Sequence, residues 1–358
     1  MGASFRRIFT AGNFFMNLVS SNAKILVTGG SGFMGSSFIR YLLGSPDFTG
    51  KIINYDLLTY AVHPGSLKAI ETSPKYKFIQ GDVTSSSHLE TLFSTEEIDA
   101  VVHFAAQTHV DRSIEGPSVF METNIRGTFT LLELVRKYPH VHFHHISTDE
   151  VYGSLGESGA FYEHSSYRPN SPYAASKAAS DHLVRAYANT YQISTTISHA
   201  SNNYGPYQFP EKFIPLMIRN CIEGKKLPIY GSGRNIRDWL FVEDHARAIW
   251  MILQKGRKGE VYNIAGGREL SNLELLEKIF LLLSYELNIP KEQWEKQKEF
   301  VSDRKGHDFR YFLDPAKIQK EIGFFPKVSL ETGLQKTVRW MIKQMQRKTY
   351  KTVLKSNP

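Results

Sequence analysis

The stretch Lys24-Ile-Leu-Val-Thr-Gly-Gly-Ser-Gly-Phe-Met-Gly35 joins a short apolar run to three evenly spaced glycines, Gly29, Gly32 and Gly35. The apolar run predicts a buried strand, and the residues after the glycines have a helical pattern. Glycines permit a tight turn, let backbone N–H groups approach a pyrophosphate, and let the helix pack against the sheet. The anion then lies at the positive end of that helix. The stretch therefore predicts a dinucleotide-binding turn.

Two aspartates stand at the ends of the strands that follow. Asp56 ends the second predicted strand, 21 residues beyond Gly35. A carboxylate there accepts hydrogen bonds from both ribose hydroxyls and repels a 2′-phosphate, which favours NAD over NADP. The plainer interpretation, a turn cap, fits the spacing less well. Asp82, at the end of the third strand, is a candidate partner for the adenine amino group.

Apolar runs alternate with helical stretches from Lys24 to about Ala200. Strands are predicted at 25–27, 52–55, 78–80, 101–104, 143–146 and 195–197, with helices at 33–44, 86–94, 118–137 and 173–191 between them. Strands that are apolar on both sides and alternate with helices are typical of a parallel sheet covered on both faces. The sequence predicts an α/β fold with a Rossmann-type doubly wound sheet.

The pattern becomes looser after Ala200. It predicts a strand at 239–242 and helices at 213–223, 243–254, 271–287 and from 329 to about 348. We expect four parts: a disordered leader (1–22), an NAD-binding domain (23–200), a smaller substrate lobe (201–340) and a basic tail (341–358). Some segments of the substrate lobe can return to the first domain.

Composition excludes several classes of protein. Hydrophobic residues make up 41% and charged residues 22% of the chain, as in an ordinary globular protein. No apolar run reaches the roughly 18 residues of a membrane span. A single cysteine, Cys221, excludes an internal disulfide and a cysteine metal cluster, and it is consistent with a cytoplasmic location.

The net charge of +8 comes from the two ends of the chain. Residues 1–24 carry three basic side chains and residues 332–358 carry seven, with no acidic residue in either range, so the rest of the chain has a net charge of −2. We therefore expect no nucleic-acid partner and no membrane partner. Residues 1–22 superficially resemble an organelle presequence, but a leader upstream of a start at Met16 explains them as well.

Tyr173-Ala-Ala-Ser-Lys177 places a tyrosine and a lysine four residues apart, on one face of a helix that Pro169 and Pro172 help to start. An ammonium beside a phenol lowers the pKa of the phenol and makes it a general base. The pair occurs by chance in many helices, but here a glycine turn precedes it, and Ser147-Thr148 follows the fifth strand. We predict a catalytic pair.

The same strand end carries two adjacent acids, Asp149 and Glu150, within HHISTDEVYG (144–153). Neighbouring side chains on a strand or helix point in different directions, so the two carboxyl groups do not share one face. A solvated turn or a helix cap is the ordinary explanation of such a pair. An acid and a base side by side require environments that separate their pKa values.

Together, TGGSGFMG, Asp56, YAASK and Ser147-Thr148 resemble the extended short-chain dehydrogenase/reductase family, and most closely its dTDP-glucose 4,6-dehydratase branch. The resemblance covers residues 24–340. Its longer blocks are AAQTHVDRSI (105–114), HHISTDEVYG (144–153), SPYAASKAASDHLVRAY (171–187), SNNYGPYQFPEKFIP (201–215), LPIYGSGRNIRDWLFVEDHARA (227–248) and DRKGHDFRY (303–311). Small departures are Leu57, His199 and Lys305, none of which touches the implied chemistry.

The resemblance implies that dTDP-glucose is dehydrated to a 4-keto-6-deoxy sugar while NAD is recycled. Tyr173, supported by Lys177, would take the proton of the 4-hydroxyl as hydride leaves carbon 4. Thr148 would hydrogen-bond the 4-oxygen. Glu150 would then remove the carbon-5 proton, and Asp149 would protonate the departing 6-hydroxyl before hydride returns to carbon 6.

The resemblance also implies two binding sites and no metal site. The cofactor residues are Gly29, Gly32, Phe33, Met34, Gly35, Asp56, Leu57, Thr59, Asp82, Val83, Phe104, Ala105, Ala106, Thr123, Tyr173, Lys177 and Asn202. The substrate residues are Thr108, His109, Thr148, Asn203, Lys212, Phe213, Pro228, Tyr230, Arg237, Asn272, Arg304 and His307.

Several alternatives remain open at this point. A UDP- or CDP-glucose dehydratase differs only in recognition of the base. A nucleotide-sugar 4-epimerase keeps the tyrosine and lysine but needs no acid or base at carbon 5, so Asp149 and Glu150 argue against it. A non-catalytic NAD-sensing protein has no need of these acid and base residues, yet all of them are present. Resemblance to the family also implies a homodimer formed through 118–137 and 173–191.

Overall fold

The computed structural model describes the backbone of residues 17–356 and the side chains of residues 17–347. Its centre is a sheet of seven parallel strands in the order β10-β6-β5-β4-β1-β2-β3. These strands are β1 (Lys24–Thr28), β2 (Lys51–Asp56), β3 (Tyr76–Gln80), β4 (Ala100–His103), β5 (His142–Thr148), β6 (Thr195–Ala200) and β10 (Val261–Ile264). The predicted α/β fold and Rossmann-type sheet are confirmed.

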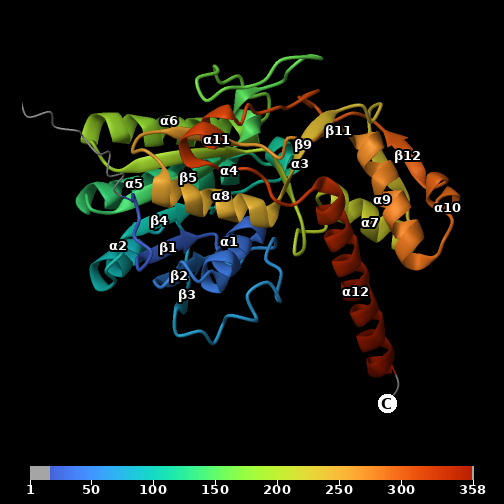
Figure 1. Cartoon of the computed structure of the whole chain (residues 1–358), viewed down its shortest axis with the longest axis horizontal. Coiled ribbons are helices and arrows are strands. Elements are labelled where there is room, and N and C mark those ends of the chain that lie inside the picture. The colour runs from blue at the N-terminus through green and yellow to red at the C-terminus, as the bar shows by residue number, and fades with distance from the viewer. Residues whose placement is uncertain (1–16, 357–358) are drawn as a thin grey trace, which may run out of the picture.

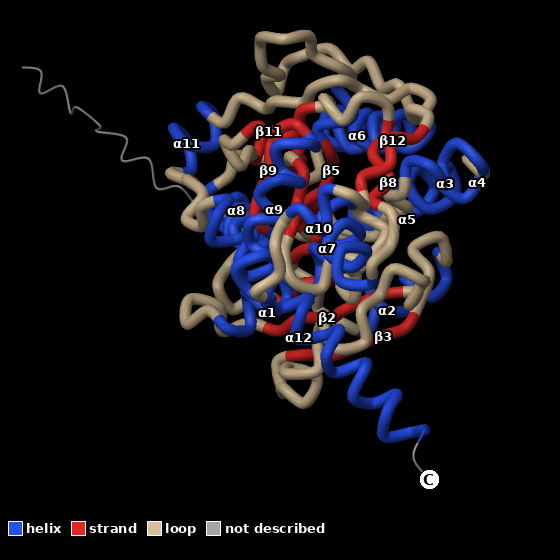
Figure 2. The backbone as a smooth tube through the Cα atoms, turned by 90° about the vertical axis from the view of Figure 1, so that its right-hand side faces the viewer, coloured by secondary structure: helices blue, strands red, loops and turns tan. Residues whose placement is uncertain are grey.

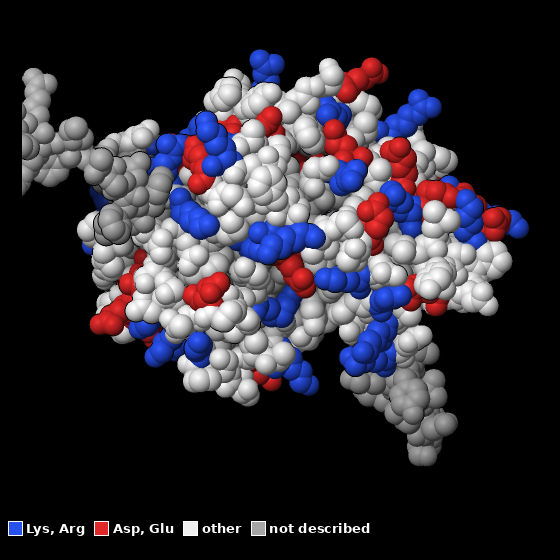
Figure 3. Space-filling view, in the orientation of Figure 1, with Lys and Arg blue, Asp and Glu red and all other residues white. Residues whose placement is uncertain are grey.

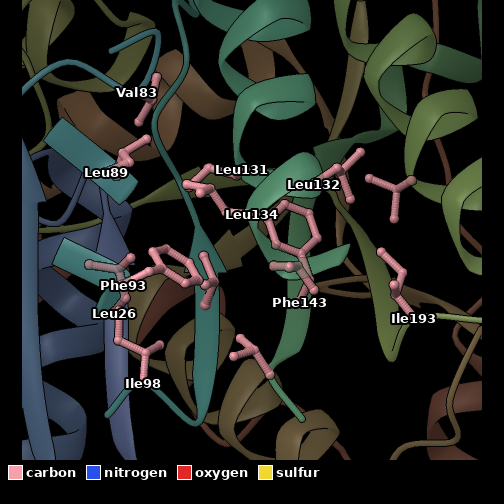
Figure 4. Packing of buried hydrophobic residues seen from close by; sticks show 14 of the residues in the cluster. Leu26, Val83, Leu89, Phe93, Ile98, Leu131, Leu132, Leu134, Phe143 and Ile193 are labelled. Carbon is pink, nitrogen blue, oxygen red and sulfur yellow. The ribbon is translucent and has the colours of Figure 1, made fainter. Parts of the chain in front are cut away.

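Helices cover both faces of this sheet because alternate strand residues point to opposite sides. On β1, Leu26 packs in the cluster that includes residues of α2 (Ser86–Thr95), α5 (Gly127–Lys137) and α6 (Pro172–Tyr191). Figure 4 shows this packing around Leu26, Leu89, Leu131 and Phe143. Ile25 and Val27 belong to the opposite cluster, with α1 (Phe33–Gly44) and α8 (Val242–Lys255). The side chains of Ile25, Leu26 and Val27 are all fully buried.

The helix predicted over 118–137 is not regular. It consists of α4 (Ser118–Phe120), a π-helical segment (Met121–Arg126) and α5. The wide turn carries Asn124, whose Oδ1 accepts the Gln107 N–H at 2.8 Å and whose Nδ2 donates to Ser176 Oγ at 2.8 Å. The π turn thus connects the loop after β4 to α6, which bears Tyr173 and Lys177.

A second lobe is built mostly from the residues after 200. Its elements are β7 (Asn202–Tyr204), α7 (Phe213–Glu223), β8 (Leu227–Tyr230), β9 (Ile236–Phe241), β11 (Glu269–Ser271), α9 (Asn272–Leu287), α10 (Glu292–Glu295), β12 (Lys298–Val301) and α12 (Leu330–Ser356). The short helix α3 (Val110–Glu115) comes earlier in the chain and packs against α6. Trp294 and Phe280 lie in its hydrophobic core. Figures 1 and 2 show α7, α9 and α10 together at the end of the molecule away from the sheet.

Some of the later chain returns to the sheet. β10 pairs with β6, α8 packs against α1, and α11 (Ala316–Ile322) packs near α8 and β10. The first lobe therefore contains residues from both sides of Ala200. A division at residue 200 describes the chain but not the two cores.

The ends of the chain differ from two expectations. Residues 1–16 lie outside the described part, but the predicted disordered leader does not extend to residue 22, because Val19 is buried and its N–H donates to Leu253 O at 2.9 Å. Helix α12 continues through the start of the predicted tail, where Met341 is still buried. The far end of α12 projects from the body of the molecule (Figure 1).

Charge is distributed as the composition predicts. Figure 3 shows Lys and Arg interspersed with Asp and Glu over the face in view, with basic side chains gathered on α12. No helix among the described residues is long and apolar enough to span a membrane.

Candidate active site

The glycine turn lies between β1 and α1, at the carboxyl ends of the strands, where the order of strands reverses. β1 stands between β2 and β4 in the sheet, and such a reversal leaves a crevice outside the carboxyl ends of the strands. Gly29 has φ +69°, and a Cβ there would lie 2.5 Å from the backbone nitrogen of Ala105, in the loop after β4. A side chain at residue 29 is therefore excluded by both conformation and space.

Asp56 holds the glycine turn in place. Its Oδ2 accepts the Ser31 N–H at 2.9 Å and its Oδ1 accepts the Leu58 N–H at 2.7 Å. Burial raises the pKa of this carboxyl, and the backbone N–H groups oppose that rise. Asp56 can thus cap the turn and still accept hydrogen bonds from a ribose, since each carboxylate oxygen has a second lone pair.

A long cavity follows the crevice from the glycine turn to the predicted catalytic residues. Of the seventeen predicted cofactor residues, every one except Lys177 lines it. Asp149, Glu150, Thr148, Thr108, Asn203 and Lys212 line the same cavity. A glycine turn that admits no side chain, an acidic strand end and an apolar wall at Val83, Phe104 and Ala105 suit a dinucleotide, so the described residues fit NAD.

Tyr173 and Lys177 lie on one face of α6, whose first turn is fixed by Pro172 and by the Ser171 hydroxyl, which accepts the Ala174 N–H at 3.1 Å. Lys177 Nζ donates to Ile146 O at 2.7 Å and lies 3.3 Å from His145 Nε2. Burial lowers the pKa of Lys177 to about 8. The lysine is thus close to its titration point near neutral pH.

The pKa of the Tyr173 phenol is shifted in the opposite direction to that of Lys177. Burial, followed by the charge of Glu150, raises its pKa, whereas the Thr148 hydroxyl lowers it. The side chains around it therefore hold Tyr173 as a neutral phenol. For the predicted base to ionise, positive charge must act on it, and Lys177 one helical turn away is the cation of the same helix.

Asp149 and Glu150 begin the 3₁₀ turn Asp149–Tyr152, which follows β5 directly. The Thr148 hydroxyl accepts the Glu150 N–H at 3.3 Å and donates to Asp149 Oδ1 at 3.1 Å. Asp149 Oδ2 is buried without a hydrogen-bond partner among the described residues. The structure thus places the pair in the cavity wall, in a turn whose first residue is buried, not in a solvated turn.

The two carboxyl groups have different surroundings. Burial and then Glu150 raise the pKa of Asp149 to about 8, so that it is protonated at neutral pH. Burial also raises the pKa of Glu150, but Lys212, Arg237 and Arg304 oppose it. An acid at residue 149 and a base at residue 150 are the protonation states that this arrangement favours.

Cationic side chains from the second lobe approach the pair. Lys212 Nζ donates to Thr108 O at 3.0 Å. Arg237 donates to the carbonyls of Ile236, Asp308 and Phe309, and its guanidinium lies 4.3 Å from the Tyr311 ring centroid. Arg237 is therefore fixed by the protein, which leaves less of its donor capacity for a ligand than the sequence suggests.

Arg304 makes a forked ion pair with Asp111, at 2.5 and 2.9 Å, and lies over the Tyr230 ring at 5.0 Å. His307 contacts Asp303 at 2.6 Å and lies beside Tyr230, with ring centroids 6.2 Å apart. His109 caps α3 and lies 3.7 Å from Glu211, and burial followed by Lys212 lowers its pKa to about 4. These residues form one group next to the cavity.

Not every predicted substrate residue lies in the cavity wall. The residues outside it are His109, Phe213, Pro228, Tyr230, Arg237, Asn272, Arg304 and His307. Of these, Phe213 begins α7, Pro228 lies in β8, and Asn272 begins α9. Their assigned roles stay predictions.

Comparison with known proteins identifies the family of the chain. The family model described as GDP-mannose 4,6 dehydratase matches residues 26–337. The chain belongs to this family. A curated relative from Haemophilus influenzae, dTDP-glucose 4,6-dehydratase, is 50% identical over 334 residues, which are 89% of this chain and 98% of the relative.

Two solved structures of dehydratases are similar to this chain over most of its length. The dTDP-glucose 4,6-dehydratase of Bacillus anthracis, in complex with NAD, is 47% identical, with a TM-score of 0.82 over 90% of this chain and 98% of that chain. The enzyme of the same name from Streptomyces venezuelae, with NAD and TDP bound, is 45% identical, with a TM-score of 0.83 over the same shares.

The site of this family member contains residues that the sequence did not single out. Gln208, Phe209 and Glu211 line the cavity, and all three fall inside the block 201–215, of which only Asn202, Asn203, Lys212 and Phe213 were predicted. Asp111 is the partner of Arg304 and lies within the block 105–114. Membership in the quoted blocks was the signal that could have found them.

Proposed function

We propose that the protein dehydrates dTDP-glucose to dTDP-4-keto-6-deoxyglucose, as a hydro-lyase that uses NAD. The observation that carries this proposal is the buried turn in which Asp149 favours its protonated form beside Glu150, in the same cavity wall as Tyr173. The names of relatives at 47–50% identity over nearly their whole lengths support the substrate. NAD bound in solved relatives supports the cofactor.

NAD, which the cofactor residues that line the cavity would hold, would supply a hydride acceptor for carbon 4, a hydride donor for carbon 6 and, when oxidised, a positive charge. Tyr173 is the group that removes the proton from the 4-hydroxyl, with the Lys177 ammonium stabilising the phenolate. Thr148, which already acts on the phenol, hydrogen-bonds the 4-oxygen. A ketone at carbon 4 then acidifies the neighbouring carbon-5 hydrogen.

Glu150 removes that hydrogen, because Lys212, Arg237 and Arg304 favour its ionised form. Asp149, protonated up to about pH 8, donates its proton to the 6-hydroxyl, which leaves as water. The partnerless Oδ2 of Asp149 is the atom available for that contact. Glu150 finally returns a proton to carbon 5.

The cationic group beside the cavity is assigned to the diphosphate. Lys212 and Arg304 are the cations, and Asn203, in the same cavity wall as Lys212, is assigned as an amide donor; a forked guanidinium suits two phosphate oxygens. Arg304 pairs with Asp111 in this structure, so a diphosphate would share or replace that carboxylate. Tyr230, Pro228 and Asn272 are assigned to the nucleotide, and Thr108 and His109 to the sugar.

We also assign the chain to a homodimer in the cytoplasm. Val119, Phe129 and Tyr191, on α4, α5 and α6, are large apolar side chains that remain 44–46% exposed on the helices predicted to pair. The one cysteine, Cys221, is buried and free, which suits a reducing compartment.

The test is incubation of the protein and NAD with dTDP-glucose, beside UDP- and CDP-glucose, with detection of the 4-keto product by its absorbance in alkali. We expect product with dTDP-glucose at the highest kcat/KM. Product only from UDP- or CDP-glucose would move the assignment to another dehydratase, and 4-epimerised sugar in place of a ketone would refute it.

A further inference from the structure

A buried carboxylate outside the proposed acid–base pair, Asp181, lies on the helix that carries the catalytic pair. It follows Lys177 by four residues and Tyr173 by eight, so all three lie along one face of α6. Its side chain is fully buried, and it does not line the cavity. The acid–base steps assigned above make no use of it.

Three donors from different parts of the chain surround one oxygen of Asp181. Oδ2 accepts Ser147 Oγ–H at 2.9 Å and Tyr167 Oη–H at 3.0 Å, and it lies 2.9 Å from His199 Nε2. These groups come from β5, from the loop before α6 and from β6. Burial would raise the pKa of this carboxyl, but hydrogen bonding from His145 and His199 outweighs burial and holds it well below its usual range. Asp181 is therefore a permanent negative charge inside the fold.

His145 connects this charge to the catalytic lysine. Its Nε2 lies 3.4 Å from Asp181 Oδ1 and 3.3 Å from Lys177 Nζ. Burial, followed by Lys177, lowers the pKa of His145 to about 4, so the ring is neutral. A neutral Nε2 either accepts from the ammonium or donates to the carboxylate, but not both at once. His145 Nε2 thus lies within 3.4 Å of both the carboxylate of Asp181 and the ammonium of Lys177.

A buried ammonium needs such a charge. Moving Lys177 out of water disfavours its protonated form, and Asp181 is the group that opposes this effect. His103, on the neighbouring strand β4, is also a base. A proton on its ring would repel the Lys177 ammonium. Without Asp181, the fold around Lys177 would favour a neutral amine.

We propose that Asp181 is a positioning residue whose buried carboxylate, held by Ser147, Tyr167 and His199, keeps Lys177 an ammonium through His145. The inference rests on the proposed function only in giving Lys177 and Tyr173 their roles. Asp181 touches neither substrate nor cofactor. It acts on Tyr173 by maintaining the cation that the phenolate requires.

Titratable and charged groups from every neighbouring element act on the protonation of Lys177 and Tyr173. Those that face Lys177, Asp181 or Tyr173 are His103 from β4, His145 from β5, Asp149, Glu150 and Tyr152 from the turn after β5, Tyr167 from the following loop and His199 from β6. Arg185 from α6 joins them through Tyr167, since it donates to the Tyr167 hydroxyl at 3.3 Å. Two opposite effects follow. Removing the charge of Asp181 directly favours an ionised Tyr173, whereas removing the proton of Lys177 disfavours it.

The sign of one measurement separates these two effects. The near-ultraviolet absorbance of tyrosinate is titrated in the full chain with NAD, and the signal absent from Tyr173→Phe is assigned to Tyr173. For Asp181→Asn we expect this signal to fall at pH 7–8, with the ratio of phenolate to phenol dropping about tenfold for each unit by which the pKa of Tyr173 rises. An unchanged or larger signal would overturn the proposal, as would the absence of any Tyr173 signal in the wild type.

Asp244→Asn is the matched control. Asp244 is also buried, accepts the N–H groups of Lys327 and Val328, and pairs with Arg247 on α8, away from the cavity. It should lose stability without changing the tyrosinate signal. An equal fall in this control would mean that the signal reports general loosening and would refute the inference.

A second variant guards against failure of Asp181→Asn to fold. In His145→Phe the new ring fills the space where His145 stacks on Phe143 and approaches His103. Lys177 then loses its imidazole neighbour while Asp181 keeps its charge, so the tyrosinate signal should fall by a smaller factor. No change here would overturn the role of His145. Because absorbance needs no turnover, a wild type that shows the signal but makes no ketone would refute the proposed function and leave this inference standing.

Discussion

Asp149 and Asp181 are both buried aspartates whose charge acts on Tyr173, and they differ in charge. Asp149 has one hydrogen bond, and burial raises its pKa to about 8. Asp181 has three neighbouring donors on one oxygen and its pKa is held well below the usual range. Burial alone therefore does not decide whether a carboxyl group is charged; the number of donors around it does.

This difference suits the two positions. A group that must give away a proton needs few donors, and Asp149 has one. A group that must stay charged needs many, and it must lie where substrate does not reach, as Asp181 does outside the cavity wall. The following experiments test that distinction, beginning with the largest effect.

Glu150→Gln should lower product formation by about 10³-fold, since an amide cannot act as a base. Oxidation at carbon 4, seen as NADH formation, should survive, and exchange of the carbon-5 hydrogen with solvent should be lost. The measurement is single-turnover absorbance of NADH together with hydrogen exchange into the sugar. Retained exchange in this variant would remove Glu150 from its assigned role.

Asp181→Asn should lower the free energy of unfolding by about 3 kcal/mol at neutral pH, because buried donors lose a charged acceptor. The folded pKa of Asp181 is depressed, so its contribution is present above the unfolded pKa and disappears as the pH falls through the folded one. Urea unfolding at several pH values measures the difference, which should shrink toward acid. A difference independent of pH would show that the charge of Asp181 is not involved.

Asp149→Asn should have the opposite trend. The folded pKa of Asp149 is raised, so between about pH 4 and 8 the unfolded chain ionises while the folded protein does not, and wild-type stability falls as the pH rises. Relative to wild type, the variant should gain up to about 4 kcal/mol between pH 5 and 8. The same urea series at both pH values measures it, and a relative loss at pH 8 would contradict a protonated Asp149.

Ser147→Ala should have the smallest effect, lowering the free energy of unfolding by about 1 kcal/mol through loss of one of the donors to Asp181. Ser113→Ala is the comparison, since Ser113 is equally buried but donates only to Val110 O within its own helix. Chemical denaturation of both variants is the readout. A larger loss at residue 113 would mean that the donors to Asp181 contribute no special stabilisation.

Most of the fold followed from pattern. The six strands predicted before residue 200 are present; five of them are short runs buried on both sides, and the edge strand β3 is partly exposed. The breaks in the prediction have local causes. The π turn at Met121–Arg126 has no signature in hydrophobic spacing, since it serves the hydrogen bonds of one buried side chain, Asn124. β10 pairs with residues of β6 that lie 64 positions earlier in the chain, as Val261 with Ile197, and periodicity cannot detect such a pairing.

The site was predictable to a different degree in its two halves. Glycine spacing and the strand ends place the cofactor residues, because backbone geometry fixes where they lie. The substrate lobe depends on side chains that meet across loops, so Arg237 could be predicted as a cation but not as one held by three backbone carbonyls. The role of Asp181 was not predicted, because its donors come from three segments that only the fold brings together.

The return of β10 to the sheet has a consequence for how the protein unfolds. β10 covers the edge of β6, and α8 supplies Ile249 and Leu253 to the core beneath β1, although both elements follow the second lobe's first helix in the chain. A fragment that ended near residue 200 would leave an open sheet edge and an uncovered face. The first lobe is therefore completed by segments that follow part of the second lobe in the chain. We expect the two lobes to melt in one transition, with tryptophan fluorescence and circular dichroism giving the same midpoint.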